Sequence, residues 1–274
     1  MISNSDCKTA CYSIHLKESL AIVDFTGDIY QLGACLDEKA TFLTRLQALN
    51  DDPEIRGLLL LNTPGVLGDE KYCQFISNAI AARSGGSDPE VHEAAYSDCP
   101  VQLERLTNTL SQITEEVLKF SKLLMVAFEG DVAPPFFGAA LAADYRFGTD
   151  EMVFQPSHLK LGIPPGGGLG FFLPRFVSHA KARDLLFSTE PTAASELKHL
   201  GLLDDHFPCN NFREECTRIA GELVEMPLLS IMGVKAIIQP HQKDLNAFLN
   251  YEDKAMAEVM ARRKFHKGEL GNNG

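Results

Sequence analysis

The chain has 274 residues, of which 45% are hydrophobic, and a formal net charge of −12. That length and apolar content predict a large core in one domain, or in one domain with an appendage. The acidic balance argues against a nucleic acid or an anionic membrane as a partner, because both favour a basic surface. No signal peptide and no run of about 18 apolar residues is visible, so we expect a cytoplasmic protein.

Seven cysteines are spread along the chain without a CxxC pair, and no histidine stands at metal-ligand spacing. Because disulfides belong to oxidising compartments, we expect reduced thiols. The sequence predicts no metal site.

The first half of the chain alternates apolar strands with helices. The pattern predicts a hairpin over residues 12–25 that turns at LKES, a helix over 37–50, and a buried strand over 56–62. The polar residues 84–100 predict an exposed loop, and an amphipathic helix then leads into the strand LLMVAF. Strands that are apolar throughout, separated by helices, predict a parallel sheet buried on both faces.

The middle third carries the most specific pattern. The strand LLMVAF is followed by GDVAPP, a small-residue helix up to Asp144, the step Phe154-Gln155-Pro156 and the loop LGIPPGGG. These pieces, in this order and spacing, resemble the crotonase superfamily, which is also called the enoyl-CoA hydratase/isomerase superfamily. A weaker likeness extends to both ends, so the resemblance covers nearly the whole chain.

The resemblance implies a fold and an assembly. We expect an α/β, crotonase-like spiral of β-β-α units over residues 10–205, followed by an α-helical trimerisation region over residues 206–274. The assembly is expected to be a homotrimer or a homohexamer. The last helix carries an apolar stripe that we expect to pack on a neighbouring subunit: Leu245, Phe248, Met256 and Met260.

The resemblance also implies a chemistry. Members of the superfamily bind an acyl-CoA thioester as substrate, without a further cofactor, and hold its carbonyl oxygen between two backbone N–H groups while an enolate forms. One donor comes from the loop after a long strand, and the other comes from the start of the central helix. In hydratases and isomerases, one or two glutamates then move protons on the acyl carbons.

The central turn departs from that pattern. Pro134, Pro135 and Phe136 stand on the family's glycine triplet, and the donor position falls on Pro135, which has no N–H. One reading is a displaced oxyanion hole that uses the N–H of Phe136 or Phe137. The other is a helix start that only packs, with proline at its favoured first position.

Both family glutamates are absent as well. Their positions carry Gly138 and Ser157, and neither residue is a carboxylate. The other donor loop is abbreviated, and its best match to the family motif is Leu67-Gly68-Asp69. An ordinary two-glutamate hydratase is therefore the function least compatible with these residues.

Four side chains are candidates for the missing acid–base chemistry: Ser157, His158, Asp131 and Asp69. His158 can titrate near neutrality, although a structural histidine is an equally simple reading. Asp131 lies two residues after Glu129, and one of the two would have a raised pKa if both faced a cavity. Asp69 either supplies a carboxylate from the opposite wall or caps the helix that follows it.

The end of the chain carries a dense basic cluster that includes Arg263, Lys264 and Lys267. The resemblance places this end of the chain near the phosphates of CoA. A simpler reading is that cations favour the C-terminus of a helix.

Three functions follow from these patterns. The first is an atypical acyl-CoA isomerase, lyase or hydrolase whose acid–base group has moved. The second is a carbon–carbon bond hydrolase that acts on a diketone without CoA and uses a histidine–carboxylate pair. The third is a non-catalytic member that retains only ligand binding or assembly.

Overall fold

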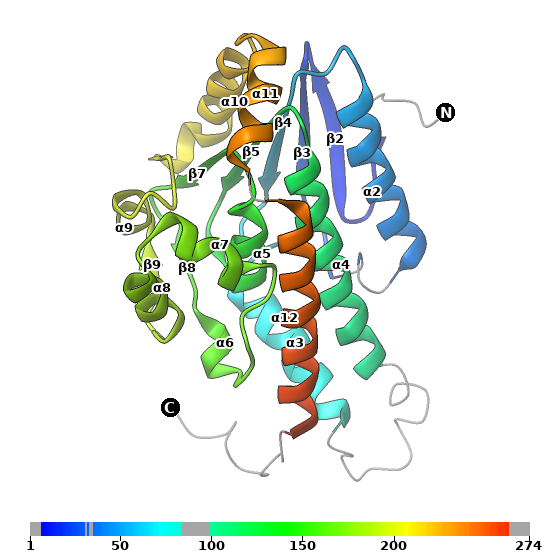
Figure 1. Cartoon of the computed structure of the whole chain (residues 1–274), viewed down its shortest axis with the longest axis vertical. Helices are drawn as coiled ribbons and strands as arrows, with labels where there is room; N and C mark the ends of the chain where they lie inside the picture. Colours follow the sequence, from blue (N-terminus) through cyan, green and yellow to red (C-terminus); the bar gives the residue numbers. More distant parts are fainter. Residues whose placement is uncertain (1–6, 31, 33–34, 84–98, 240, 263–274) are drawn as a thin grey trace.

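The computed structural model describes residues 7–30, 32, 35–83, 99–239 and 241–262, around a seven-stranded sheet (Figure 1). In spatial order the strands are β1 (Cys7–Lys8), β2 (Tyr12–Lys17), β3 (Leu20–Phe25), β4 (Gly57–Asn62), β5 (Leu123–Phe128), β7 (Tyr145–Thr149) and β10 (Asp205–Phe207). Strands β1 to β3 pair antiparallel, and the pairings from β3 to β10 are parallel.

The predicted strands are confirmed, and their burial agrees with the sequence pattern. Strands β4 and β5 are buried along their whole length, as a parallel sheet covered on both faces requires. The N-terminal hairpin turns more tightly than predicted, because Lys17 and Leu20 already pair and only two residues connect them. Glu18 in that turn adopts a left-handed φ of 55°.

The remaining elements surround this sheet. Before the central turn lie α2 (Leu36–Asp51), α3 (Asp69–Arg83) and α4 (Cys99–Lys119). A small second sheet joins β6 (Asp131–Val132), β8 (Val153–Phe154) and β9 (Thr192–Ala193). The later helices are α5 (Pro134–Ala140), α6 (Ser157–Lys160), α7 (Leu169–Phe176), α8 (His179–Leu186), α9 (Ala194–His199), the short 3₁₀ helix η1 (Cys209–Asn211), α10 (Phe212–Leu223), α11 (Leu228–Ile238) and α12 (Gln242–Arg262).

Alternate residues of the strands belong to two cores. Leu58 and Leu60 of β4 lie in the larger core, together with residues of α2, α4 and α5. Leu59 and Leu61 lie in a smaller core, which α10 closes through Phe212. The period of two along a strand explains this division, since successive side chains point to opposite faces.

Helix α12 packs on its own chain, and this corrects the role expected for its apolar stripe. Leu245, Met256 and Met260 are 0%, 4% and 2% exposed in the larger core, and Phe248 packs against the same core. The helix lies beside α4 (Figure 1). Because the stripe is used within the chain, it is not a free surface for a neighbouring subunit.

Two further expectations concern segment boundaries. The predicted loop over 84–100 lies mostly outside the described residues, and its last two residues already belong to α4. Strand β10 extends the sheet two residues past the predicted boundary at 205. Within the described ranges, no helix combines the length and the apolar character needed to cross a bilayer.

Candidate active site

Helix α5 begins at the central turn. Pro134 and Pro135 occupy its first two positions, after Ala133 as the N-cap residue. Their missing N–H groups cost no intrahelical bond at these positions. Phe137 donates its N–H to the carbonyl oxygen of Ala133 at 3.2 Å, whereas the N–H of Phe136 has no acceptor among the described residues. Of the two predicted donors, the amide of Phe136 is therefore the available one.

The loop after β4 is joined to this turn by three sets of hydrogen bonds. The buried side chain of Asn62 bonds both the N–H and the carbonyl of Glu129, at 3.2 and 2.9 Å. Ala133 donates its N–H to the carbonyl of Leu67 at 2.9 Å, and Asp131 accepts the N–H of Asp69 at 2.7 Å. These bonds hold two segments together that are far apart in the sequence.

The N–H groups of Leu67 and Gly68 likewise have no acceptor in the described part of the chain. The carbonyl of Leu67 is already bound to the turn, so its free amide is held close to the start of α5. The structure thus brings together two unpartnered backbone donors, Leu67 and Phe136, which the sequence had suggested from separate motifs. Hydrogen-bond donors held in advance of binding are what an oxyanion hole requires.

Asp131 and Glu129 do not form the carboxylate pair that the sequence suggested. The Asp131 carboxylate binds the first turn of α3 and lies close to Gly68, where a Cβ atom would come within 2.7 Å of its Oδ1. Glu129 instead forms an ion pair with Arg213 of α10. The structure therefore gives both carboxylates structural partners on opposite sides of the turn.

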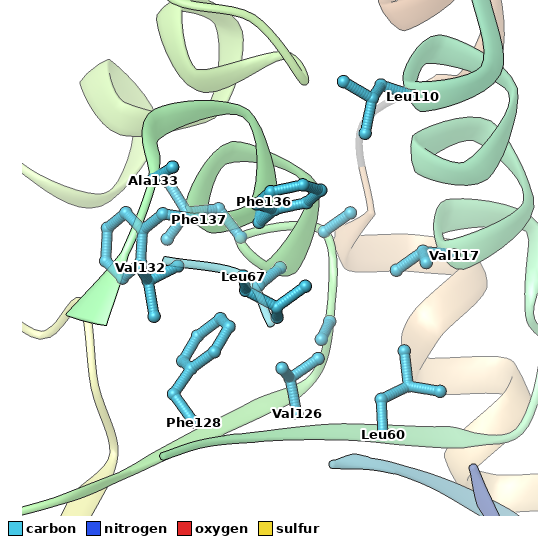
Figure 2. Packing of buried hydrophobic residues seen from close by; sticks show 14 of the residues in the cluster. Leu60, Leu67, Leu110, Val117, Val126, Phe128, Val132, Ala133, Phe136 and Phe137 are labelled. Atoms are coloured by element: carbon cyan, nitrogen blue, oxygen red, sulfur yellow. The ribbon is translucent and has the colours of Figure 1, made fainter. Parts of the chain in front are cut away.

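An apolar cavity of about 60 Å³ is lined by Leu67 and Phe136, the two residues with free amides. Leu67 and Phe136 form its upper wall, strands β4 and β5 contribute Leu60 and Val126 below, and Val117 of α4 closes one side (Figure 2). Phe136 is packed rather than exposed, since its ring meets the edge of Tyr30 at 6.0 Å between centroids. The cavity suits the apolar part of a ligand whose polar atom accepts a hydrogen bond at its edge.

A cluster of polar side chains lies around Tyr30, whose ring contacts Phe136. The buried atoms Tyr30 Oη, Asp69 Oδ1 and Ser157 Oγ have no hydrogen-bond partner among the described residues. Burial and the carboxylate of Asp69 raise the pKa of the Cys73 thiol to about 11, and Ser157 is close enough to influence it. Because such atoms are normally paired in native proteins, their position here favours a binding site.

His158 is directed toward α8. The side chain is 1% exposed, and its Nε2 lies 2.8 Å from the carbonyl oxygen of Leu186 at the end of α8. Facing a carbonyl, Nε2 carries the proton, and Nδ1 is buried without a partner. Burial lowers the pKa of His158, so the ring is neutral at pH 7. This arrangement favours the structural reading of His158.

The position of the first family glutamate is closed by backbone. A Cβ atom on Gly138 would lie 2.7 Å from the N of Leu169, 2.8 Å from the O of Gly167 and 2.9 Å from the O of Gly166. The loop that contains Gly167 packs still more closely on Pro135, whose carbonyl oxygen is 1.9 Å from where a Gly167 Cβ would lie. No side chain fits at position 138 unless this loop moves.

A buried carboxyl reaches the same loop from the last helix. Glu252 of α12 is 7% exposed, and its Oε2 accepts the N–H of Gly168 at 2.9 Å. Its Oε1 has no partner among the described residues. Together with Tyr72 and Pro135, Glu252 lines a cavity of about 20 Å³, which is room for one water-sized group. Burial raises the pKa of Glu252 to about 8.

The sequence analysis missed Tyr30, Tyr72, Cys73 and Glu252. For Glu252 a signal was present, because it lies four residues after Phe248 and four before Met256, within the apolar stripe of the last helix. A carboxylate on the buried face of an amphipathic helix is uncommon and indicates a special role. Tyr30 in a turn and Tyr72 and Cys73 on α3 carry no such signal.

Asp144, which ends the small-residue segment of the family pattern, has structural partners. Its Oδ2 accepts the N–H of Leu124 at 2.8 Å and pairs with Lys235 at 2.6 Å. The predicted phosphate-binding residues Arg263, Lys264 and Lys267 lie outside the described residues.

Comparison with known sequences gives consistent matches. A profile of the family described as enoyl-CoA hydratase/isomerase matches residues 90–271. The protein named "Putative enoyl-CoA hydratase/isomerase YhaR" from Bacillus subtilis (strain 168) is 31% identical over 185 residues, which cover 67% of this chain and 71% of that protein. Carnitinyl-CoA dehydratase from Salmonella typhi is 26% identical over 227 residues, covering 82% and 79%.

Solved structures are similar in fold. An enoyl-CoA hydratase from Bacillus halodurans superposes with a TM-score of 0.74 at 16% identity, over 92% of this chain and 96% of that one. An enoyl-CoA hydratase from Mycobacterium avium subsp. paratuberculosis K-10 gives 0.71 at 15% identity, over 97% and 100%. At these identities the likeness concerns the fold alone.

Proposed function

Since the chain belongs to the enoyl-CoA hydratase/isomerase family and has its crotonase-like α/β fold, we propose that it binds an acyl-CoA thioester and stabilises the enolate of the acyl group. The substrate class is supported by the names of the relatives, which refer to CoA thioesters. The reaction class that fits is an isomerisation, lyase or hydrolase step that passes through such an enolate.

The observation that carries the proposal is the bond from Ala133 to Leu67, which ties the segment with the unpartnered amide of Leu67 to the start of the helix with the unpartnered amide of Phe136. A thioester carbonyl accepts two hydrogen bonds, and its oxygen gains negative charge as the enolate forms. Two donors fixed before the substrate arrives stabilise that charge without reorganisation. The apolar cavity beside them takes the acyl group, and the unpartnered Asp69 and Ser157 supply polar contacts at its edge.

Hydration by the usual pair of glutamates does not fit this site. Position 138 is closed by the glycine loop, and position 157 carries a hydroxyl. The site therefore retains the groups that bind the thioester oxygen, while its proton transfer depends on another residue.

The diketone hydrolase is the weaker candidate. It needs a histidine oriented by a carboxylate, and His158 is bound to a backbone carbonyl instead. A histidine–carboxylate pair does exist between His206 and Asp150, 2.6 Å apart, but both lie at the β7–β10 edge of the sheet, outside the walls of the two cavities described above.

Titration calorimetry with three matched ligands tests the proposal: butyryl-CoA, its S-butyl thioether analogue, and free CoA. The thioether lacks only the carbonyl oxygen. We expect butyryl-CoA to bind at least about threefold more tightly than the thioether, as one or two net hydrogen bonds provide. Equal affinities for the two would contradict a carbonyl-binding site. A cyclic diketone is titrated separately: binding of the diketone alone would favour the hydrolase, and no binding of any of these compounds would favour a non-catalytic role.

We also propose a homotrimer or homohexamer, although its support now comes from α11 instead of α12. Leu229, Ile237 and Ile238 of α11 are 84%, 83% and 71% exposed. Several large apolar side chains exposed on one helix are typical of a subunit interface. Light scattering at micromolar concentration is expected to give three or six subunits, and a stable monomer would contradict this.

A further inference from the structure

Among the described carboxyl residues, Glu252 alone is buried, and no cation pairs with it. Its Oε2 is held by the N–H of Gly168, and its Oε1 is without a partner among the described residues. By contrast, Glu129 is paired with Arg213, and Asp131 binds the start of α3. A carboxyl that is buried, oriented by one bond and free at its second oxygen has the features of a proton-transferring group.

The loop that holds Glu252 also fills the space of the missing glutamate. Gly166 and Gly167 occupy the volume into which a side chain at position 138 would project. The next residue, Gly168, donates its N–H to Glu252. One loop therefore excludes a carboxylate from helix α5 and positions a carboxylate from helix α12.

The small cavity relates Glu252 to the carbonyl-binding amides. Glu252 and Pro135 both line it, and Pro135 directly precedes Phe136, whose N–H is free. Leu110 lines this cavity and the apolar one as well, so the two spaces are neighbours. The carboxyl of Glu252 therefore lines the space next to the one that is proposed to take the acyl group.

We propose that Glu252 is the catalytic acid–base residue of this site, and that it removes and returns the proton on the acyl carbon next to the thioester carbonyl. The inference rests on the proposed function.

In the forward step, Oε1 of the ionised carboxylate takes the α proton. The electrons of that C–H bond form a carbon–carbon double bond, and the carbonyl π electrons move to the oxygen, which the amides of Leu67 and Phe136 stabilise. In the return step, the protonated carboxyl gives the proton back to the same carbon or to a conjugated one. Atoms and charges balance without any further reactant.

The surroundings of Glu252 set the pH at which it acts. Tyr72 faces it from α3, and Asp253 lies beside it on α12, bound to Ser111 of α4 at 3.2 Å and close to Glu115. Burial is the largest cause that raises the pKa of Glu252 to about 8. Because the ionised form is the base, exchange is expected to rise about tenfold from pH 7 to pH 9 and then to level off.

Exchange of the α hydrogens of butyryl-CoA in D₂O, followed by mass spectrometry, tests the proposal. The wild type is expected to incorporate deuterium well above a protein-free blank. Glu252→Gln keeps an oxygen for the Gly168 N–H but cannot take a proton, so it is expected to exchange at least about a hundredfold more slowly. Glu258→Gln removes an exposed carboxyl two turns further along the same helix and is the matched control, with unchanged exchange.

The outcomes distinguish the assignment of Glu252 from the proposed acyl-CoA function. Butyryl-CoA affinity within about threefold of wild type in Glu252→Gln, together with lost exchange and a lost rise with pH, supports the assignment. Exchange in Glu252→Gln within about threefold of wild type overturns it, and so does a wild type that binds butyryl-CoA without exchange. Failure of the wild type to bind butyryl-CoA overturns the proposed function, and the assignment with it.

Discussion

The two sides of helix α5 differ in how tightly they are packed. At its start, the N–H of Phe136 is left without an acceptor beside an apolar cavity, next to the free amide of Leu67. Around Gly138, one turn further on, the helix is in backbone contact with the glycine loop, and no side chain fits. In the proposed function, the start of the helix binds the thioester oxygen, whereas backbone atoms fill the space around Gly138, where the family has its acid.

The close packing around Gly138 also restricts which residues the facing loop can carry. Close contact of backbone with backbone requires glycine, and the loop therefore carries Gly166, Gly167 and Gly168, of which the last two have φ values of +67° and +75°. The side of α5 around Gly138, here called the closed side, is expected to be rigid and sensitive to substitution. The side around Phe136, here called the open side, is expected to tolerate changes that leave the Phe136 amide in place.

The largest effect concerns hydration. Because neither family position carries a carboxylate, crotonyl-CoA hydration is expected to be at least about a thousandfold slower than in an ordinary two-glutamate hydratase, since each acid–base group contributes about a hundredfold or more. The loss of ultraviolet absorbance of the conjugated thioester measures this. Near-normal turnover would show that the closed side of α5 does not determine the chemistry.

Gly138→Ala tests the closed side directly. The added Cβ meets three backbone atoms at 2.7 to 2.9 Å, so we expect a loss of at least about 2 kcal/mol in the free energy of unfolding. Gly221→Ala on α10 is the matched control, because nothing lies within 4 Å of its Cβ position. There alanine is expected to stabilise the helix by about 0.5–1 kcal/mol. Equal behaviour of the two variants in urea unfolding would refute the close packing.

The pH dependence of stability tests the burial of Glu252. Its pKa rises from 4.5 to about 8 on folding, so the folded chain holds a proton that the unfolded chain releases between these values. Stability is therefore lost as the pH rises toward 8, by about 1.4 kcal/mol per unit at most. Glu252→Gln removes this slope and is expected to gain roughly 2 kcal/mol over wild type between pH 6 and pH 8.

Urea unfolding at several pH values measures that gain. Glu258→Gln, which removes an exposed carboxyl of the same helix, controls for the change in net charge. A constant difference between Glu252→Gln and wild type at all pH values would contradict a buried, protonated Glu252.

The smallest effect is expected at the open side. Pro135→Gly restores an N–H at the family's donor position. Because the Phe136 amide is proposed to donate to the thioester oxygen already, butyryl-CoA affinity should change by less than about tenfold, or 1.4 kcal/mol. Pro134→Gly is the control at the neighbouring position. Each variant is expected to lose about 1 kcal/mol of stability through greater freedom of the unfolded chain. A gain in affinity well beyond tenfold for Pro135→Gly alone would show that proline had closed the oxyanion hole.

Much of the fold was predictable because it depends on local patterns. The apolar strands over Gly57–Asn62 and Leu123–Phe128, and the helix started by Pro134, follow from periodicity and from proline's preference for a helix start. The choice between Phe136 and Phe137 was not predictable, since it depends on which N–H the carbonyl of Ala133 happens to accept.

The acid–base group depends on contacts between distant segments. Glu252 approaches Gly168 across 84 positions of sequence, and only the packing of α12 onto its own chain brings them together. The stripe on α12 predicted a buried face correctly but assigned it to a neighbouring subunit, because an apolar stripe does not say which surface it covers. The partner of Asp131 was not predictable for a similar reason, as it is an amide of α3.

Infrared difference spectroscopy with butyryl-CoA labelled with ¹³C at the thioester carbonyl tests the central claim most directly. Hydrogen bonds from the amides of Leu67 and Phe136 polarise the carbonyl and weaken its double bond. The account predicts that the stretching frequency of the bound carbonyl falls below that of butyryl-CoA in water. A frequency equal to the value in an apolar solvent would mean that the carbonyl lies among the side chains of the cavity without donors, and would contradict the account.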